Sequence, residues 1–165
     1  GQIFLESELF HSGVMPAVNP GISVSRVGGS AQIKAMKKVS GSLKLLYSQY
    51  IELKSFSQFG SDLDTDTKTR LAQGERIVEV LKQDRNHPID VAHQIAIIYA
   101  VTNNMLMDIE VSDIGAFEDG LFSYMNSHCV DIIDEIHNTG VMSNESTAKL
   151  AEAINQYKAT FLNSK

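Results

Sequence analysis

The sequence has little of what would cross-link the chain, carry it through a membrane or bind it to nucleic acid. Its single cysteine, Cys129, excludes an internal disulfide, which is typical of a protein from a reducing compartment. Cys129 lies in a helical pattern, and we interpret it as a small packing residue. No apolar run approaches the ~20 residues that cross a bilayer, and no secretory signal is recognisable. The net charge of −6 argues against a nucleic-acid partner.

Motifs that would give the chain a catalytic centre of its own are missing too. The phosphate-binding pattern G-x-x-x-x-G-K-[ST] does not occur, and no Ser-His-Asp or Cys-His arrangement follows from the spacing. Asp62, Asp64 and Asp66 alternate as in a calcium-binding loop. However, Thr67 stands where that loop needs Gly, and Gln73 where it needs Glu. None of the five histidines is four residues from another, as a zinc-binding helix requires. We expect no metal site, and interpret the acidic run as a solvent-facing loop with helix-capping acids.

What the sequence does contain is a helical pattern behind a short strand-like start. Residues 2–5 and 22–27 show the alternation of half-buried strands. From Ser30, whose hydroxyl can cap a helix, apolar residues recur every three or four positions. The spacing predicts helices over residues 31–57, 65–83, 91–102, 112–140 and 143–161, with Asp90, Ser112 and Ser143 as caps and Gly140 as a stop. The expected fold is mainly α, with about five amphipathic helices behind a strand-containing segment.

Arg26 is the residue that this pattern singles out for chemistry. It ends the second strand-like run, just before a glycine pair and the first long helix. A guanidinium held there can deliver a fixed positive charge to a phosphate, and pairing with a local carboxylate is the alternative. Because the chain has no phosphate-binding loop, such a phosphate would be held by another polypeptide or by further sequence. The one tight basic cluster, on the first helix, is expected to be a solvated face: Lys34, Lys37 and Lys38.

Two runs make the sequence resemble the α subunit of F-type ATP synthases. Ser-Val-Ser-Arg-Val-Gly at residues 23–28 and Phe-Gly-Ser-Asp-Leu-Asp at residues 59–64 together distinguish α from the catalytic β subunit, and the resemblance covers essentially all 165 residues. It implies that residues 1–29 are the strand-containing end of an α/β nucleotide-binding domain and that residues 30–165 are the C-terminal helical domain. Since the chain opens on Gly1 and not on Met, we expect it to be a piece of a longer protein, and the resemblance implies that this piece is the last third.

The resemblance also implies residues that act on other subunits. Arg26 matches the arginine finger that α extends into the catalytic site of a neighbouring β subunit. There a fixed guanidinium would stabilise the charge that develops on the transferred γ-phosphoryl group. A loop at the base of the helical domain matches the contact with the rotating γ shaft: Ser61, Asp62, Leu63 and Asp64.

A third set of residues matches the adenine pocket of the regulatory, non-catalytic nucleotide that α itself binds. Phe10, Pro16 and Gln83 agree with the family there. Met15 stands where the family usually has Arg, and Arg85 where it usually has Gln. We therefore expect ATP or ADP with Mg²⁺ in the full-length subunit, altered at this pocket, and no cofactor on this chain alone.

The resemblance thus implies a regulatory, non-catalytic part of a proton-translocating ATP synthase. Its partners would be the β and γ subunits in an α3β3 hexamer, peripheral on the cytoplasmic face of a bacterial plasma membrane or its organellar equivalent. The chain alone would have no ATPase activity. The alternatives are a free-standing helical interaction module and, less compatible with the missing motifs, an enzyme with its own site. The N-terminal apolar residues would lack cover, which predicts disorder, repositioning or self-association.

Overall fold

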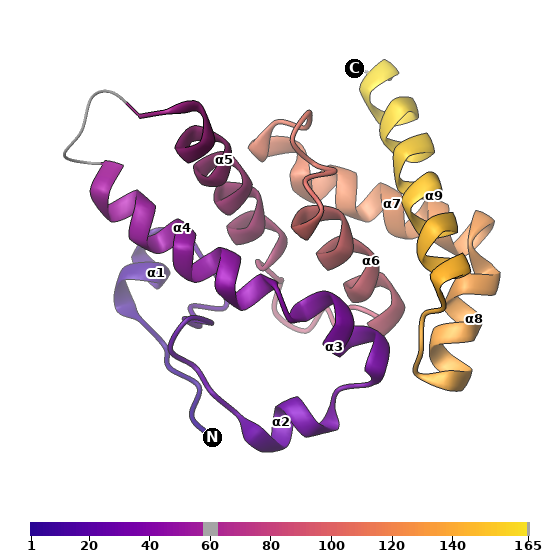
Figure 1. Cartoon of the computed structure of the whole chain (residues 1–165), viewed down its shortest axis with the longest axis horizontal. Helices are drawn as coiled ribbons and strands as arrows, with labels where there is room; N and C mark the ends of the chain where they lie inside the picture. The colour runs from indigo at the N-terminus through magenta and orange to yellow at the C-terminus, as the bar shows by residue number, and fades with distance from the viewer. Residues whose placement is uncertain (58–62, 165) are drawn as a thin grey trace.

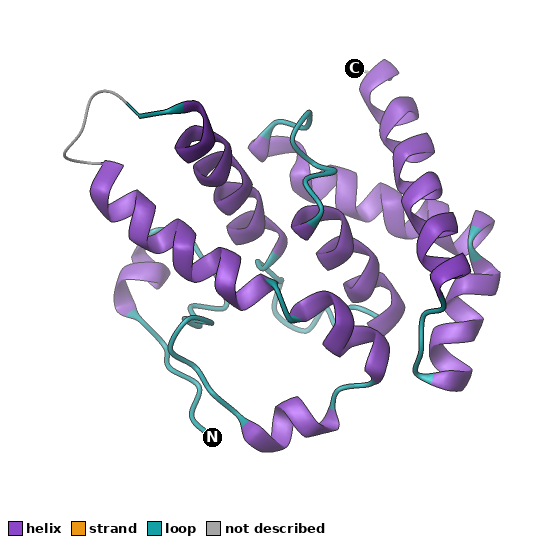
Figure 2. Ribbon diagram, in the orientation of Figure 1, coloured by secondary structure: helices purple, strands orange, loops and turns teal. Residues whose placement is uncertain are grey.

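A computed structural model describes residues 1–57 and 63–164, and these are helical wherever they are regular (Figures 1 and 2). The N-terminal segment contains the short helices α1 (Ser7–His11) and α2 (Arg26–Ala31). The remaining elements are α3 (Lys34–Ser40), α4 (Leu43–Ser57), α5 (Thr65–Val80), α6 (Val91–Thr102), the 3-10 turn η1 (Val111–Asp113), α7 (Ile114–His128), α8 (Val130–Thr139) and α9 (Asn144–Asn163). No described helix is both long enough and apolar enough to cross a bilayer.

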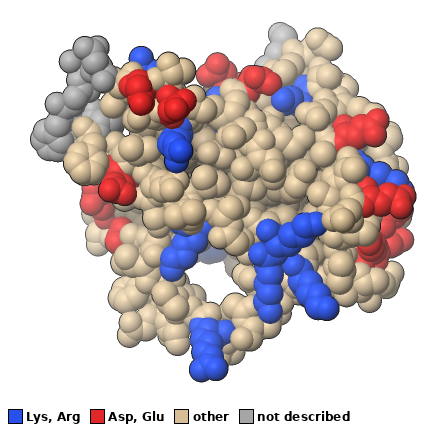
Figure 3. Space-filling view, viewed as in Figure 1, with Lys and Arg blue, Asp and Glu red and all other residues tan. Residues whose placement is uncertain are grey.

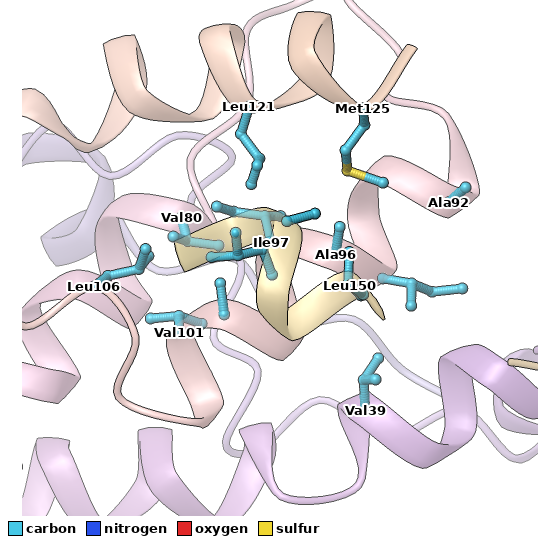
Figure 4. Packing of buried hydrophobic residues seen from close by; sticks show 14 of the residues in the cluster. Val39, Val80, Ala92, Ala96, Ile97, Val101, Leu106, Leu121, Met125 and Leu150 are labelled. Carbon is cyan, nitrogen blue, oxygen red and sulfur yellow. The ribbon is translucent and has the colours of Figure 1, made fainter. Parts of the chain in front are cut away.

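The core forms around α6. This helix buries an almost continuous apolar surface, and α3, α5, α8 and α9 pack against it while α4 lies along α5 (Figure 1). Figure 4 shows aliphatic side chains from α3, α5, α6, α7 and α9 converging on one another, among them Val39, Val80, Ile97, Leu121 and Leu150. Each exposes only a few per cent of its surface. Burying such a side chain contributes about 1.5–3 kcal/mol to the free energy of unfolding. The helical bundle therefore has its own continuous core.

Several helix ends follow the sequence. The Asp90 carboxylate accepts a hydrogen bond from the N–H of Ala92 at 2.9 Å and caps α6. The Ser143 hydroxyl accepts from the N–H of Ser146 at 3.1 Å and caps α9. Gly140 ends α8 with φ +67°, a conformation that a glycine adopts without strain. The predicted caps and stop are confirmed at these positions.

Two of the long predicted helices are interrupted. The helix expected over residues 31–57 divides into α3 and α4 at Gly41 and Ser42, a pair of poor helix formers at which helices commonly kink. The helix expected over residues 112–140 divides into α7 and α8 at Cys129, beyond which α8 packs on both α6 and α7. Ser112 lies in η1 and does not cap α7. Continuous apolar spacing did not reveal either break.

The expected strands are wrong within the described residues. Gln2 pairs with Val24 and Leu5 with Val18, but each pair is an isolated bridge. Two extended segments without a third strand rarely form a stable sheet in water. The second predicted strand also ends early, because residues 26–31 form α2. Ser25 caps this helix by accepting from the N–H of Gly28 at 2.9 Å, so Ser30 lies inside α2 and does not begin a helix.

The loop between α6 and η1 is held by a buried guanidinium that was not predicted from the sequence. Arg76 of α5 donates to the carbonyl oxygens of Leu106 at 2.8 Å, Met107 at 3.1 Å and Ile109 at 2.7 Å. Lys158 of α9 donates to the carbonyl of Met105 at 3.0 Å. Buried charges are costly unless they are hydrogen-bonded. The three hydrogen bonds from Arg76 to backbone carbonyls therefore explain how its guanidinium is accommodated with only 9% of the residue exposed.

Candidate functional site

A cavity of about 640 Å³ opens where the N-terminal segment meets the chain after α5. One wall comes from the end of α1 and the loop that follows it, and the other from the loop after α5. Its lining is mostly apolar with a polar rim: Leu5, Phe10, Met15, Pro16, Ala17, Gln83, Asp84 and Arg85. A concave apolar surface with a few polar groups is the usual form of a small-molecule site.

Local hydrogen bonds shape both walls. Gly13, with φ +78°, reverses the chain after α1, and the N–H of Val14 donates to the carbonyl of Leu9 at 2.9 Å. The N–H of Gln83 donates to the carbonyl of Met15 at 3.0 Å and joins the two walls. The cavity is therefore formed by segments that lie far apart in the sequence.

The Gln83 side chain presents a defined polar atom. Its Nε2 donates to the carbonyl oxygen of His87 at 2.9 Å. A carbonyl can only accept, so the amide nitrogen must face His87, and Oε1 is the atom left to accept from a ligand. Nearby, the Phe10 ring is 58% exposed and offers a face on which a planar group can stack.

All five residues that the resemblance assigned to the adenine pocket line this one cavity: Phe10, Met15, Pro16, Gln83 and Arg85. Leu5, Ala17 and Asp84 line it as well and were not foreseen, although Ala17 and Asp84 adjoin residues that were. Among the described residues, Arg85 and Asp84 each lack an ion-pair partner, and both are exposed. The rim thus offers an unpaired guanidinium next to an unpaired carboxylate.

Arg26 lies apart from this cavity, as the first residue of α2 and not at the end of a strand. Its side chain is exposed, and no carboxylate of the described chain lies within ion-pairing distance. The local pairing that was the alternative reading is therefore not found. Lys44 and Lys37 donate to the carbonyls of Ser23 at 3.3 Å and Ser30 at 3.4 Å, on either side of Arg26.

The face of the molecule that carries α2 and α3 is predominantly basic. Figure 3 shows Lys and Arg side chains gathered over this part, while Asp and Glu side chains lie over other elements. The predicted basic cluster is exposed, as expected of a solvated face: Lys34, Lys37 and Lys38.

Of the four residues assigned to the rotor contact, Ser61 and Asp62 lie outside the described residues. Leu63 is half-buried and Asp64 is exposed. The Asp64 carboxylate accepts from the N–H of Thr67 at 2.8 Å and caps α5, and hydrogen bonding to Thr67 holds the pKa of Asp64 below its usual range. The predicted helix-capping acid is confirmed, while the rotor contact remains a prediction.

Three other titratable side chains, those of His93, His137 and Cys129, have structural partners or are buried. His93 stacks on Phe122, and the His137 ring lies 2.9 Å from the Asp90 carboxylate. Burial raises the pKa of the Cys129 thiol, in agreement with a packing role. No group of three or more potential ligands that could hold a metal ion occurs in the described part of the chain.

Glu118 of α7 is a buried carboxyl group that was not predicted from the sequence. It is 8% exposed and lines a hollow between α7 and the chain at the end of α5, together with the ion-paired Lys82 and Glu79. Burial raises the pKa of Glu118 to about 7, and the neighbouring charge of Asp119 adds to this rise.

Comparison with known proteins identifies the family. The sequence pattern described as "ATP synthase alpha/beta chain, C terminal domain" matches residues 32–157, which is most of the chain. The chain belongs to this ATP synthase family. It is 58% identical over 161 residues to the sodium ion specific ATP synthase subunit alpha of Acetobacterium woodii, and 55% identical over 162 residues to ATP synthase subunit alpha of Clostridium acetobutylicum.

These matches cover 98% of this chain and 32% of each relative, so the chain spans about a third of the length of these α subunits. The similarity confirms the resemblance to α and the mainly helical class of the ATP synthase C-terminal domain. It does not support protons over sodium as the coupling ion, because one relative is named as sodium ion specific.

Proposed function

We propose that this chain works as the C-terminal part of the regulatory, non-catalytic α subunit of a rotary ATP synthase. Its partners would be β and γ subunits in an α3β3 hexamer, peripheral to a bacterial plasma membrane or its organellar equivalent. The observation that carries the proposal is the cavity, which gathers on one surface all the residues that the resemblance assigns to a nucleotide. Residues 61–64 would contact the γ shaft, and the coupling ion would be proton or sodium.

In this proposal Arg26 acts on a phosphate bound by another subunit. Its support is an exposed guanidinium with no carboxylate partner in the described residues, in a chain without a phosphate-binding loop. A preorganised cation stabilises the charge that develops on the γ-phosphoryl oxygens, which is the main catalytic need of phosphoryl transfer. The chain alone would have no ATPase activity, since it holds neither the phosphate nor the base.

The cavity would hold the base of the regulatory nucleotide, with Mg²⁺ and the phosphates bound elsewhere in the full-length subunit. Phe10 would stack on the purine, and Gln83 Oε1 would accept from its amino group. Stacking of a base on an aromatic side chain is worth about 1–3 kcal/mol.

Calorimetric titration of MgATP into the full-length α subunit tests this assignment. Phe10→Ala should weaken binding on the order of tenfold. Phe56→Ala is the matched control, because Phe56 is 67% exposed on α4 and lies outside the cavity. Equal affinity of the Phe10→Ala variant and the parent for MgATP would show that the base does not bind in this cavity.

The two departures from the family predict a second effect. Restoring Met15→Arg and Arg85→Gln together should change the affinity for MgATP, since both positions lie on the cavity. The same titration measures it, and an unchanged affinity would mean that neither position contacts the nucleotide.

A further inference from the structure

The polar rim of the cavity combines hydrogen-bond donors with hydrogen-bond acceptors. Arg85 carries only donors, Asp84 only acceptors, and neither has an ion-pair partner in the described chain. Gln83 contributes one acceptor, Oε1, because His87 fixes its amide nitrogen. A ligand at this rim therefore meets a planar fork of donors next to two acceptors.

Purine bases differ in which of these groups they satisfy. A 6-oxopurine presents O6 and N7 as adjacent acceptors, which a guanidinium binds through two parallel hydrogen bonds. It also carries a donor at N1–H, and guanine carries a second at its 2-amino group, both suited to a carboxylate. Adenine presents a 6-amino donor, and its N1 is an acceptor that gains nothing from Asp84. An amide side chain, which can both donate and accept, suits the adenine edge better than a guanidinium does.

We infer that Arg85 and Asp84 allow this cavity to bind guanine and hypoxanthine nucleotides in addition to adenine nucleotides. The inference rests on the proposed nucleotide-binding function of the same cavity. Arg85 would donate to O6 and N7, Asp84 would accept from N1–H, and Phe10 would stack on either kind of purine. Gln83 Oε1 would still accept from the amino group of adenine, so ATP would not be excluded.

The test compares the dissociation constants of MgGTP and MgATP for the isolated full-length α subunit, which is free of the catalytic sites of β. Arg85→Gln replaces the guanidinium by an amide and should raise the ratio of the GTP constant to the ATP constant on the order of tenfold. Asp84→Asn should weaken GTP more than ATP. Arg70→Gln is the matched control, because Arg70 is exposed on α5, donates to Gln49 at 3.3 Å and lies outside the cavity.

Failure of the inference and failure of the proposed function give different results. A GTP-to-ATP ratio that Arg85→Gln leaves unchanged, with ATP binding still sensitive to Phe10→Ala, overturns the inference alone. A parent protein that binds ATP and rejects GTP has the same meaning. ATP binding that is absent, or indifferent to Phe10→Ala, overturns both. A ratio raised by Arg85→Gln and not by Arg70→Gln supports the relaxed base selectivity.

Discussion

Arg26 is the first residue of α2, and its side chain is exposed. The side chains of Lys44 and Lys37 donate to the backbone carbonyls on either side of it, at Ser23 and Ser30. We expect Arg26→Ala in the assembled ATP synthase to lower the rate of ATP hydrolysis about a thousandfold or more, the usual effect of removing an arginine finger. Assembly should be unaffected, because the side chain is exposed and has no ion-pair partner in the described chain.

Steady-state hydrolysis and size-exclusion chromatography measure the two effects separately. Arg70→Gln, which removes an exposed arginine of α5, should leave both unchanged. If the Arg26→Ala complex turned over at the parent rate, Arg26 would have no part in phosphoryl transfer.

Glu118 gives a prediction for stability. Its pKa is raised from 4.5 to about 7 in the folded protein, so the folded state holds this proton more tightly than the unfolded state does. The resulting stability is present in full below pH 4.5 and is lost as the pH rises towards 7 and beyond. At about 1.4 kcal/mol for each pKa unit, the full difference amounts to about 3 kcal/mol.

Glu118→Gln should remove this loss, since the amide cannot ionise. Urea unfolding of the 165-residue chain at pH 5 and pH 8 should show a smaller decline for the variant than for the parent. Glu52→Gln, at an exposed position of α4, serves as the control and should decline with the parent. Identical declines in all three proteins would show that Glu118 ionises freely in the folded state.

At the scale of elements, the contact between α4 and α5 depends on a missing side chain. A Cβ at Gly74 would lie 2.4 Å from the Cβ of Tyr50, which is itself buried. Rotation of the tyrosine ring cannot relieve that overlap, because the Tyr50 Cβ is fixed to the backbone. The two helices would have to move apart.

We therefore expect Gly74→Ala to destabilise the chain by about 1–3 kcal/mol, despite the better helix propensity of alanine. Gly115→Ala is the matched control in α7, where a Cβ would meet nothing within 4 Å. It should be neutral or stabilising by up to about 1 kcal/mol. Thermal unfolding of both variants measures the difference, and a Gly74→Ala protein as stable as the control would show that α4 and α5 can separate freely.

The helices were largely predictable because their apolar period and their caps are local properties of the sequence. Asp90, Ser143 and Gly140 act where the pattern placed them. The breaks at Gly41 and Cys129 were not predictable from that period, since the same apolar face continues on both sides of each. The strand prediction failed for a different reason: residues 2–5 and 22–27 alternate correctly, but a strand also needs neighbours, and alternation does not supply them.

At the scale of the whole molecule, the exposed apolar side chains of the described chain are concentrated in the first 27 residues. Ile3, Leu5, Val24 and Val27 are between 60% and 78% exposed. Such a patch favours association in a soluble protein. We expect the 165-residue chain to self-associate as its concentration rises, and Ile3→Ser with Val24→Ser to shift the equilibrium towards monomer.

Light scattering over a concentration series measures this equilibrium. Ile51→Ser is the control, because Ile51 is a partly exposed apolar residue of α4, away from the N-terminal segment. A parent chain that stays monomeric throughout would mean that the exposed patch is not adhesive.

The candidate site was predictable only in part. Its residues could be named because the sequence resembles a family, and five of them line one cavity. Their chemistry required the fold. That Gln83 offers its oxygen follows from where the carbonyl of His87 lies, and that Arg26 and Arg85 have no described carboxylate partner follows from what surrounds them. Spacing along a chain specifies neither.

The hydrogen bond between the N–H of Gln83 and the carbonyl of Met15 has a thermodynamic consequence for the cavity it closes. The two walls come from segments that this contact brings together, so a ligand that touches both walls holds the two segments against each other. By mass action, any ligand held there stabilises the docked state of the first 20 residues, by an amount that grows with the ligand concentration relative to its Kd. Occupancy of the cavity would thereby be measurable as slower amide exchange across the first 20 residues, including those that do not line the cavity.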